Sequence, residues 1–265
     1  MVRCQAVMEA MERIAPRRLA EEWDNPGLLV GSPGDEVSKI LVALDVREET
    51  IDRAIKDGCD MIVSHHPLIF RGLKAVRTDD ATGRKIARLL RHGIAVFAAH
   101  TNLDSAEGGV NDVLAERLGL AEVAALMPGA EGEGLGLGRV GTLAASQPLP
   151  LDAFAELVKQ RLGLFAVRVV RAGDRKVRRV ALCGGSGAEF VGRAAALGAD
   201  VYVTGDVKYH DGERAVGLGI HVVDAGHFAT EQLIVERLAE ALTAQLGGTV
   251  EMFADTKSSD FFQIL

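Results

Sequence analysis

Residues 60–70 read Asp60-Met61-Ile62-Val63-Ser64-His65-His66-Pro67-Leu68-Ile69-Phe70. A short apolar run, 61–63, is followed at once by two adjacent histidines and a proline. The run has the length of a buried strand, and the proline has no N–H with which to continue the pairing. Two imidazoles at the end of a strand are candidate metal ligands, so the rest of the chain must supply the carboxylates that such a site needs.

The first half of the chain alternates apolar strands with helices. We expect strands at 28–30, 39–44, 61–63 and 94–99, and helices at 5–14, 48–57, 81–91 and 110–118. This alternation of fully apolar strands with helices indicates a mostly parallel sheet covered on both faces. Ligands of such sheets bind at the carboxyl ends of the strands. The polar residues that follow the predicted strands are Asp45, His65, His66, His100 and Asp104.

The second half resumes this pattern after a glycine-rich segment, 128–138, which lacks the spacing of a phosphate loop and is expected to be a linker or mobile loop. Strands are expected at 139–144, 165–170, 177–182, 200–204 and 219–223, and helices at 151–162, 189–197 and from 233 onward. The strands 165–170 and 177–182 are predicted to form a hairpin. The glycine turn 183–187 is suited either to an anion or to close packing of a strand and a helix.

Composition excludes several classes of protein. The 265 residues, 48% of them hydrophobic and 25% charged, suit one large or two ordinary globular domains. A net charge of −7 without a run of five basic residues argues against a nucleic-acid partner. Three widely spaced cysteines indicate reduced thiols, and acidic residues near the start and short apolar runs argue against a signal peptide or a membrane span. We expect a soluble cytoplasmic protein with no membrane partner.

Two later segments offer further ligands. His227 and Glu231 are spaced i, i+4, which at the start of a helix places an imidazole and a carboxylate on one face. Asp104 adds an oxygen ligand, although a role as N-cap of the following helix explains it equally well. The adjacent His65 and His66 are expected to point in different directions, each toward one of two neighbouring ions. Mixed nitrogen and oxygen ligands suit Zn, Fe, Mn or Co.

Five motifs, in order, closely resemble the Nif-three-like family, whose members often carry the name GTP cyclohydrolase I type 2 homologue. The resemblance runs over nearly the whole chain. The motifs are Trp23-Asp24-Asn25-Pro26-Gly27-Leu28, Ser64-His65-His66-Pro67-Leu68-Ile69-Phe70, His100-Thr101-Asn102-Leu103-Asp104, Thr204-Gly205-Asp206-Val207-Lys208-Tyr209-His210 and Gly226-His227-Phe228-Ala229-Thr230-Glu231.

The resemblance implies an α/β fold of two α/β/α lobes with mostly parallel or mixed sheets, and a metal site in the cleft between them. We place the first lobe at 1–125 and the second at 126–265, with the C-terminal helix closing the site. Two divalent ions per chain are implied. His65 and Asp104 would bind one ion, His66 and His227 the other, and Glu231 would bridge them. A ring-shaped homohexamer is also implied, without the long mid-chain insert of some relatives.

The implied activity is that of a hydrolase similar to GTP cyclohydrolase I type 2, in which metal-activated water attacks a carbon of a nucleotide or a related small molecule. His100, Asp206 and His210 are then candidates for orienting ligands or for transferring protons. Two alternatives stay open, a non-enzymatic protein that binds metal or protein partners and a metal-dependent phosphoesterase. Trp23, the single tryptophan, is expected to anchor the core or an interface.

Overall fold

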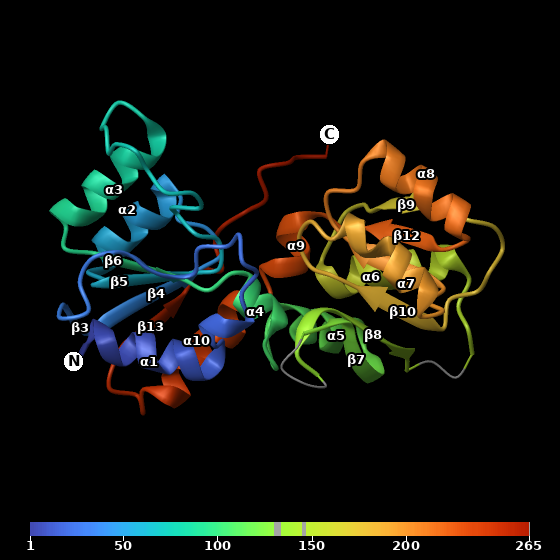
Figure 1. Cartoon of the computed structure of the whole chain (residues 1–265), viewed down its shortest axis with the longest axis horizontal. Coiled ribbons are helices and arrows are strands. Elements are labelled where there is room, and N and C mark those ends of the chain that lie inside the picture. Colours follow the sequence, from blue (N-terminus) through green and yellow to red (C-terminus); the bar gives the residue numbers. More distant parts are fainter. Residues whose placement is uncertain (130–133, 145–146, 265) are drawn as a thin grey trace. The chain divides into compact units, whose positions relative to one another are not determined.

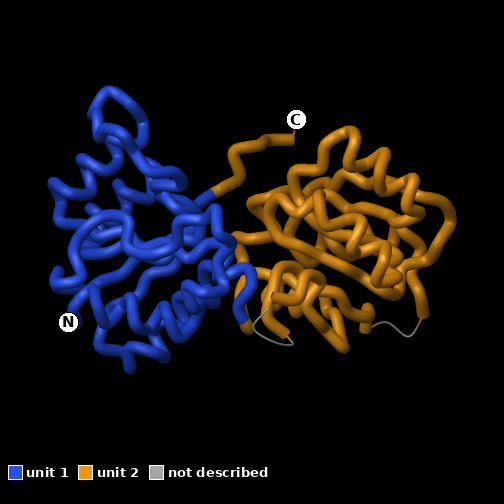
Figure 2. The backbone as a smooth tube through the Cα atoms, in the orientation of Figure 1, with its two compact units in different colours: residues 1–106, 234–258 blue, residues 107–233, 259–265 orange. Residues whose placement is uncertain are grey.

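The computed structural model describes residues 1–129, 134–144 and 147–264. The chain forms two compact units (Figure 2): unit 1 contains residues 1–106 and 234–258, and unit 2 contains residues 107–233 and 259–265. Each unit has its own sheet with helices on both faces, which confirms the predicted α/β fold of two lobes (Figure 1). The division differs from the predicted one at 125/126, because the chain enters unit 2 at residue 107 and returns to unit 1 at residue 234.

The main sheet of unit 1 has the strand order β13-β4-β5-β6-β2. Its first four strands are parallel, and β2 pairs antiparallel with β6 at the edge. The strands are β2 (Gly27–Val30), β4 (Lys39–Ala43), β5 (Met61–Ser64), β6 (Ala95–Ala98) and β13 (Glu251–Ala254), and a separate antiparallel pair is β1 (Val2–Arg3) with β3 (Glu36–Val37). The pairing of β13 with β4 returns the C-terminal part of the chain to the first sheet. Such long-range pairing explains why the position of a residue in the chain did not reveal the division into units.

Helices cover both faces of this sheet, α2 and α3 on one face and α1 and α10 on the other (Figure 1). The helical segments of unit 1 are α1 (Cys4–Ile14), η1 (Arg17–Leu19), α2 (Glu48–Asp57), α3 (Ala81–Arg91), α4 (Thr101–Ser105) and α10 (Ile234–Gln245). Leu41, Ile62 and Val96 of the strands pack with Ile51 of α2 and Leu89 of α3 in one buried cluster. Each such side chain contributes roughly 1.5–3 kcal/mol by leaving water, and this packing fixes the ends of the strands that carry the candidate ligands.

The sheet of unit 2 has the order β7-β8-β10-β11-β12-β9, with β10, β11 and β12 parallel. Its strands are β7 (Leu120–Pro128), β8 (Gly136–Leu143), β9 (Arg168–Val170), β10 (Arg179–Leu182), β11 (Val201–Thr204) and β12 (His221–Asp224). The predicted hairpin between the segments that contain β9 and β10 is wrong. The strand β10 has β8 on one side and β11 on the other, so β9 pairs antiparallel with β12 at the edge instead.

Helices α5 and α6 cover one face of the second sheet, and α7 and α8 cover the other (Figure 1). The helical segments of unit 2 are α5 (Val110–Leu118), α6 (Leu151–Leu162), η2 (Ala188–Phe190), α7 (Val191–Ala196), α8 (Tyr209–Leu218) and α9 (His227–Glu231). The ends of the predicted glycine-rich loop, 128–138, belong to β7 and β8, which pair antiparallel. Residues 130–133 of that loop lie outside the described residues. In the described ranges, no helix is both long and apolar enough to cross a membrane.

Candidate metal centre

The two adjacent histidines of unit 1 lie close together beyond the end of strand β5. Strand β5 ends at Ser64, and the N–H groups of His65 and His66 donate to the consecutive carbonyls of Ala43 and Leu44. In a regular parallel strand only every second residue donates toward the same neighbour, so the extended alternation has ended here. The two imidazole rings consequently lie side by side, with their centroids 4.9 Å apart.

A third histidine joins them from the end of the neighbouring strand β6. The ring centroid of His100 lies 5.2 Å from that of His65 and 5.7 Å from that of His66. One ring nitrogen of each of the three lies within 4.8 Å of the other two. We call these residues the histidine cluster; it belongs entirely to unit 1 and could hold a metal ion.

Each ring of the histidine cluster is oriented through Nδ1. The Nδ1 of His65 lies 2.9 Å from the carbonyl oxygen of Ala99, that of His66 lies 2.8 Å from Asp45 Oδ1, and that of His100 lies 2.8 Å from Asp24 Oδ1. A carbonyl or carboxylate oxygen can only accept, so Nδ1 carries the proton in each ring. The lone pair of the neutral ring is therefore on Nε2, the arrangement that orients metal-ligating histidines. Imidazole nitrogens oriented in this way suit a soft or borderline divalent ion, which binds a neutral ring through its lone pair.

The carboxylate of Asp104 lies next to this cluster. Asp104 lies on helix α4, and its Oδ1 is 3.6 Å from His65 Nε2. Two ligand atoms that each lie about 2.1 Å from one tetrahedral ion are roughly 3.4 Å apart. An electron-rich nitrogen and a carboxylate oxygen at this separation suit a cation held between them. The alternative role of Asp104 as an N-cap is excluded, because Gly109 precedes helix α5.

Asp24 and Asp45 are two carboxylates that the sequence prediction did not assign to the site. Burial alone would raise the pKa of Asp24, but the hydrogen bonds of His100 and Thr101 and the charge of His100 hold that pKa well below its ordinary value. Burial would likewise raise the pKa of Asp45, and the hydrogen bonds and charges of His66 and Arg47 hold it low. Both side chains are thus ionised acceptors. The position of Asp45 directly after a strand was the available signal.

Unit 2 contains a second histidine with the same arrangement. The Nδ1 of His227 lies 2.8 Å from Asp206 Oδ2, and its Nε2 lies 3.0 Å from Glu231 Oε2, one turn along helix α9. The Asp206 carboxylate accepts from Nδ1, and the other ring nitrogen, Nε2, faces the carboxylate of Glu231. The predicted i, i+4 pair therefore forms, and it offers one nitrogen and one oxygen ligand.

The glycine turn after β10 supports the buried carboxylate of this pair. Gly185 has φ +63°, and a Cβ atom there would lie 2.1 Å from Glu231 Oε1 and 3.2 Å from His227 Nε2. The Gly185 N–H donates to Thr230 Oγ1 at 2.9 Å. The sequence left two roles open for this turn, an anion site or close packing of a strand and a helix. The structure favours close packing, because Gly185 leaves room for the carboxylate of Glu231 on helix α9.

Asp206 adopts a conformation that few residues with a side chain tolerate. Its φ of +55° places it in the left-handed region, which costs on the order of 1–2 kcal/mol. The preceding Gly205 is packed so tightly that a Cβ there would lie 2.6 Å from the backbone nitrogen of His227. This strained turn points the Asp206 carboxylate toward the imidazole of His227. Backbone strain of this kind is often found at functional sites.

The third predicted catalytic residue, His210, lies at the surface. Its side chain is 87% exposed, and its Nδ1 lies 3.1 Å from Glu213 Oε2 on helix α8. His221 is another histidine of unit 2, and it is buried. Its Nδ1 accepts from the Ala172 N–H, and its Nε2 lies 2.9 Å from the Arg175 carbonyl oxygen. Both of its nitrogens therefore serve the fold.

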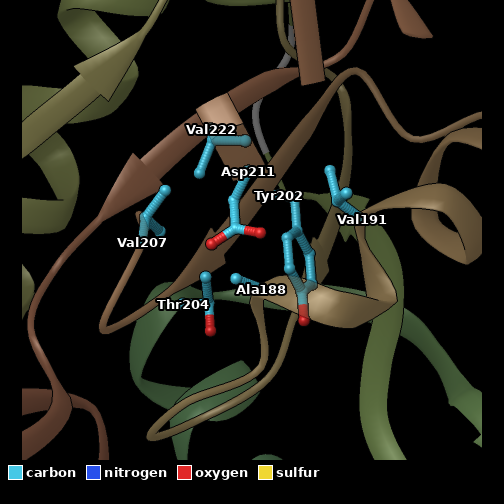
Figure 3. Close-up of a pocket in the computed structure, with 7 residues that line it drawn as sticks. All are labelled: Ala188, Val191, Tyr202, Thr204, Val207, Asp211 and Val222. Carbon is cyan, nitrogen blue, oxygen red and sulfur yellow. The ribbon is translucent and has the colours of Figure 1, made fainter. Parts of the chain in front are cut away.

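A small hollow in unit 2 has mainly apolar walls (Figure 3). It is lined by Ala188, Val191, Tyr202, Thr204, Val207, Asp211 and Val222. Its polar groups serve internal hydrogen bonds: the Tyr202 hydroxyl donates to the Gly187 carbonyl, and Asp211 Oδ2 accepts from the Lys208 N–H at the start of α8. The hollow therefore carries no chemistry comparable with that of the histidines.

Comparison with known proteins agrees with the motifs. The model of the family described as Duf34/NIF3 (NGG1p interacting factor 3) matches residues 2–259. A Clostridium perfringens protein named GTP cyclohydrolase 1 type 2 homolog is 35% identical, over 98% of this chain and 98% of its own length. The Bacillus subtilis protein of the same name is 32% identical in an alignment of 345 residues, longer than this chain, as expected for a relative with an insert.

Solved structures of related proteins have the same fold as this chain. A Bacillus cereus protein related to NIF3 superposes with a TM-score of 0.93 at 30% identity, over 100% of this chain and 99% of its own. Reduced HcgD from Methanocaldococcus jannaschii superposes with a TM-score of 0.82 at 31% identity, over 95% of this chain and 97% of its own. The chain belongs to the Duf34/NIF3 family.

Proposed function

We propose that the protein is a dinuclear, divalent-metal-dependent hydrolase similar to GTP cyclohydrolase 1 type 2, acting on a nucleotide or a related small molecule. One observation carries the proposal. In each unit a histidine with its proton fixed on Nδ1 turns Nε2 toward a carboxylate oxygen, His65 toward Asp104 and His227 toward Glu231. The names of the similar proteins supply the reaction class.

Each unit contributes part of the proposed ligand set. Unit 1 provides His65, His66 and Asp104, and unit 2 provides His227 and Glu231. Neither part alone has enough ligands for two ions, so the assignment of all five residues to one pair of ions stays a prediction. Zn, Fe, Mn or Co would suit these nitrogen and oxygen donors. Divalent ions held there would lower the pKa of water and polarise an electrophile.

The residues around the ligands have distinct tasks. Asp45 and Asp206 hold the Nδ1 protons of His66 and His227, which orients the rings and increases the basicity of Nε2. His100, held in the same way by Asp24, would accept a proton at Nε2 from the attacking water and return it to the leaving nitrogen or oxygen. His210 remains a further proton-transfer candidate at the start of α8.

Metal-free protein reconstituted with Zn, Mn or Fe and incubated with GTP tests the proposal. Hydrolytic loss of a purine carbon would release formate, and His66→Ala should abolish this release together with part of the bound metal. His100→Ala should keep the metal and lose turnover. The matched control is His92→Ala, because His92 is an exposed residue at the end of α3.

The other outcomes separate the alternatives. Metal bound without any turnover would favour the binding protein, and release of phosphate or pyrophosphate without ring opening would favour the phosphoesterase. Metal analysis tests the dinuclear assignment directly, because saturation at one ion per chain would contradict it. The proposed homohexamer is tested by light scattering, where a mass other than six chains would exclude it.

A further inference from the structure

Two aromatic side chains of unit 1 are exposed and lie in contact. Trp23, the only tryptophan, is 60% exposed and Phe70 is 42% exposed. Of the two roles expected for Trp23, an anchor of the core or of an interface, the exposure excludes the core. The two rings lie against each other, with centroids 5.8 Å apart and planes inclined by 57°. Single exposed aromatic residues need no explanation, but a contacting pair from segments 47 positions apart in the sequence does.

The pair is held in place by hydrogen bonds rather than by packing alone. Asp24 Oδ1 accepts from the Asn25 N–H at 2.8 Å, which fixes the turn that carries Trp23. The Asn25 side chain then donates from Nδ2 to the Ile69 carbonyl at 2.6 Å, which ties the loop of Phe70 to the same turn. The two exposed rings are thus positioned before any ligand arrives.

The same carboxylate connects the pair to the histidine cluster. Asp24 also orients His100, whose ring lies 6.2 Å from that of Trp23 and 6.1 Å from that of Phe70, both nearly edge-on. An exposed aromatic face therefore adjoins one of the rings that we assign to chemistry. A ligand whose reacting atom reaches the cluster would bring its remaining atoms within range of these rings.

The loop of Phe70 also carries positive charge. Arg71 and Lys74 are exposed, and within the described residues neither forms an ion pair with a carboxylate. The acidic groups of this loop have other partners, since Asp79 pairs with Arg77 and Asp80 caps helix α3 through the N–H groups of its first turn. Arg71 and Lys74 therefore offer positive charge to an anionic group of a ligand, while the exposed Glu21 and Glu22, which precede Trp23 in the sequence, carry the opposite charge.

We propose that Trp23 and Phe70 form the stacking surface for the purine ring of a nucleotide substrate, with Arg71 and Lys74 facing its phosphates. This inference deepens the proposed function and rests on it for the choice of nucleotide. Aromatic rings bind bases by stacking because every base has a π-face. Trp23 and Phe70 are binding residues that set specificity for a planar ring and take no part in proton transfer.

The single tryptophan makes the test direct. The protein is loaded with Zn, because this ion does not quench fluorescence by redox chemistry. It is then titrated with GTP and, separately, with inorganic tripolyphosphate. Stacking on Trp23 predicts that GTP quenches the tryptophan emission to saturation, whereas tripolyphosphate, which has the charge but no ring, does not. Equal effects of the two compounds, or no binding of GTP, would overturn the proposal.

Variants then separate stacking from other effects. By calorimetric titration Trp23→Ala should weaken GTP binding by about 5- to 150-fold, the range for loss of one stacked base, while Trp23→Phe should recover most of the affinity. Phe165→Ala is the matched control, because Phe165 is 83% exposed in unit 2. The same variants should leave tripolyphosphate binding and the number of bound metal ions unchanged.

The failures of the two proposals are distinguishable. GTP that stacks without being hydrolysed would refute the hydrolase while the binding surface stands. Hydrolysis of GTP with the same KM in the wild type and Trp23→Ala would refute the surface alone. If Trp23→Ala instead changes the molecular mass in light scattering at unchanged GTP affinity, the pair is an interface between copies of the chain and the proposal is wrong.

Discussion

Replacement of Gly185 by alanine should lower metal affinity about 10- to 100-fold without unfolding unit 2. The new Cβ would lie 2.1 Å from Glu231 Oε1 and 3.0 Å from its Cδ, so the carboxylate must move by more than an ångström to reach an ordinary contact distance. Displacement of a metal ligand or of its support typically costs 10–100-fold in affinity. The left-handed φ of +63° adds a backbone penalty of about 1–2 kcal/mol.

The chain offers a matched control for the backbone penalty. Gly163, which ends helix α6 in the same unit, has φ +67°, and a Cβ there would meet nothing within 4 Å. Gly163→Ala should therefore lower the midpoint of thermal unfolding of the metal-free protein by several degrees, at roughly 2–4 °C for each kcal/mol. Only Gly185→Ala should also lose metal affinity in a calorimetric titration. Equal metal affinities in the two variants would refute the assignment of Glu231 as a ligand.

Three other variants test separate parts of the structure. Asp45→Ala should weaken metal binding about 10- to 100-fold in a competitive chelator titration, because His66 loses the acceptor that fixes its Nδ1 proton; an unchanged affinity would contradict that role. Burial alone would raise the pKa of Asp60, but hydrogen bonds from Ser38 and from the Lys39 N–H hold that pKa below its ordinary value. Its carboxylate therefore stabilises the fold at neutral pH and loses this effect as the pH falls through the lowered pKa. Asp60→Asn should cost about 2 kcal/mol in urea unfolding at neutral pH and progressively less in acid. His221→Ala should destabilise unit 2, since two buried hydrogen bonds are lost, yet leave the number of bound metal ions at the wild-type value by metal analysis.

The sequence predicts local structure well wherever the pattern is itself local. The apolar run 61–63 lies in β5, and the helices expected at 48–57 and 81–91 are α2 and α3. In each case the signal and the structure lie within one turn or one strand. The i, i+4 spacing of His227 and Glu231 is of the same kind, because one turn of helix brings the two side chains together.

Relations between distant strands were not predictable in this way. The sequence does not say that β9 pairs with β12 or that β13 returns to β4, because many pairings satisfy the same apolar pattern. The contact of Gly185 with Glu231 depends on such long-range order. The orienting roles of Asp24 and Asp45 depend on it as well, since each reaches a histidine from another segment of the chain.

One rule of sheet geometry accounts for the arrangement in both units. In unit 1 the neighbouring strands β4, β5 and β6 are followed by Asp45, by His65 and His66, and by His100. Adjacent strands lie about 4.7–4.9 Å apart, and the ring centroid of His100, beyond β6, lies 5.2 and 5.7 Å from those of His65 and His66, beyond β5.

Unit 2 repeats this construction on its own parallel strands. Gly185 follows β10, Asp206 follows β11 and His227 follows β12, again in neighbouring positions of the sheet. In both units a carboxylate beyond the end of one strand fixes Nδ1 of a histidine beyond the end of the next, Asp45 with His66 and Asp206 with His227. The spacing of parallel strands thus sets the spacing of the ligands, and the loops need only choose which side chain stands at each strand end.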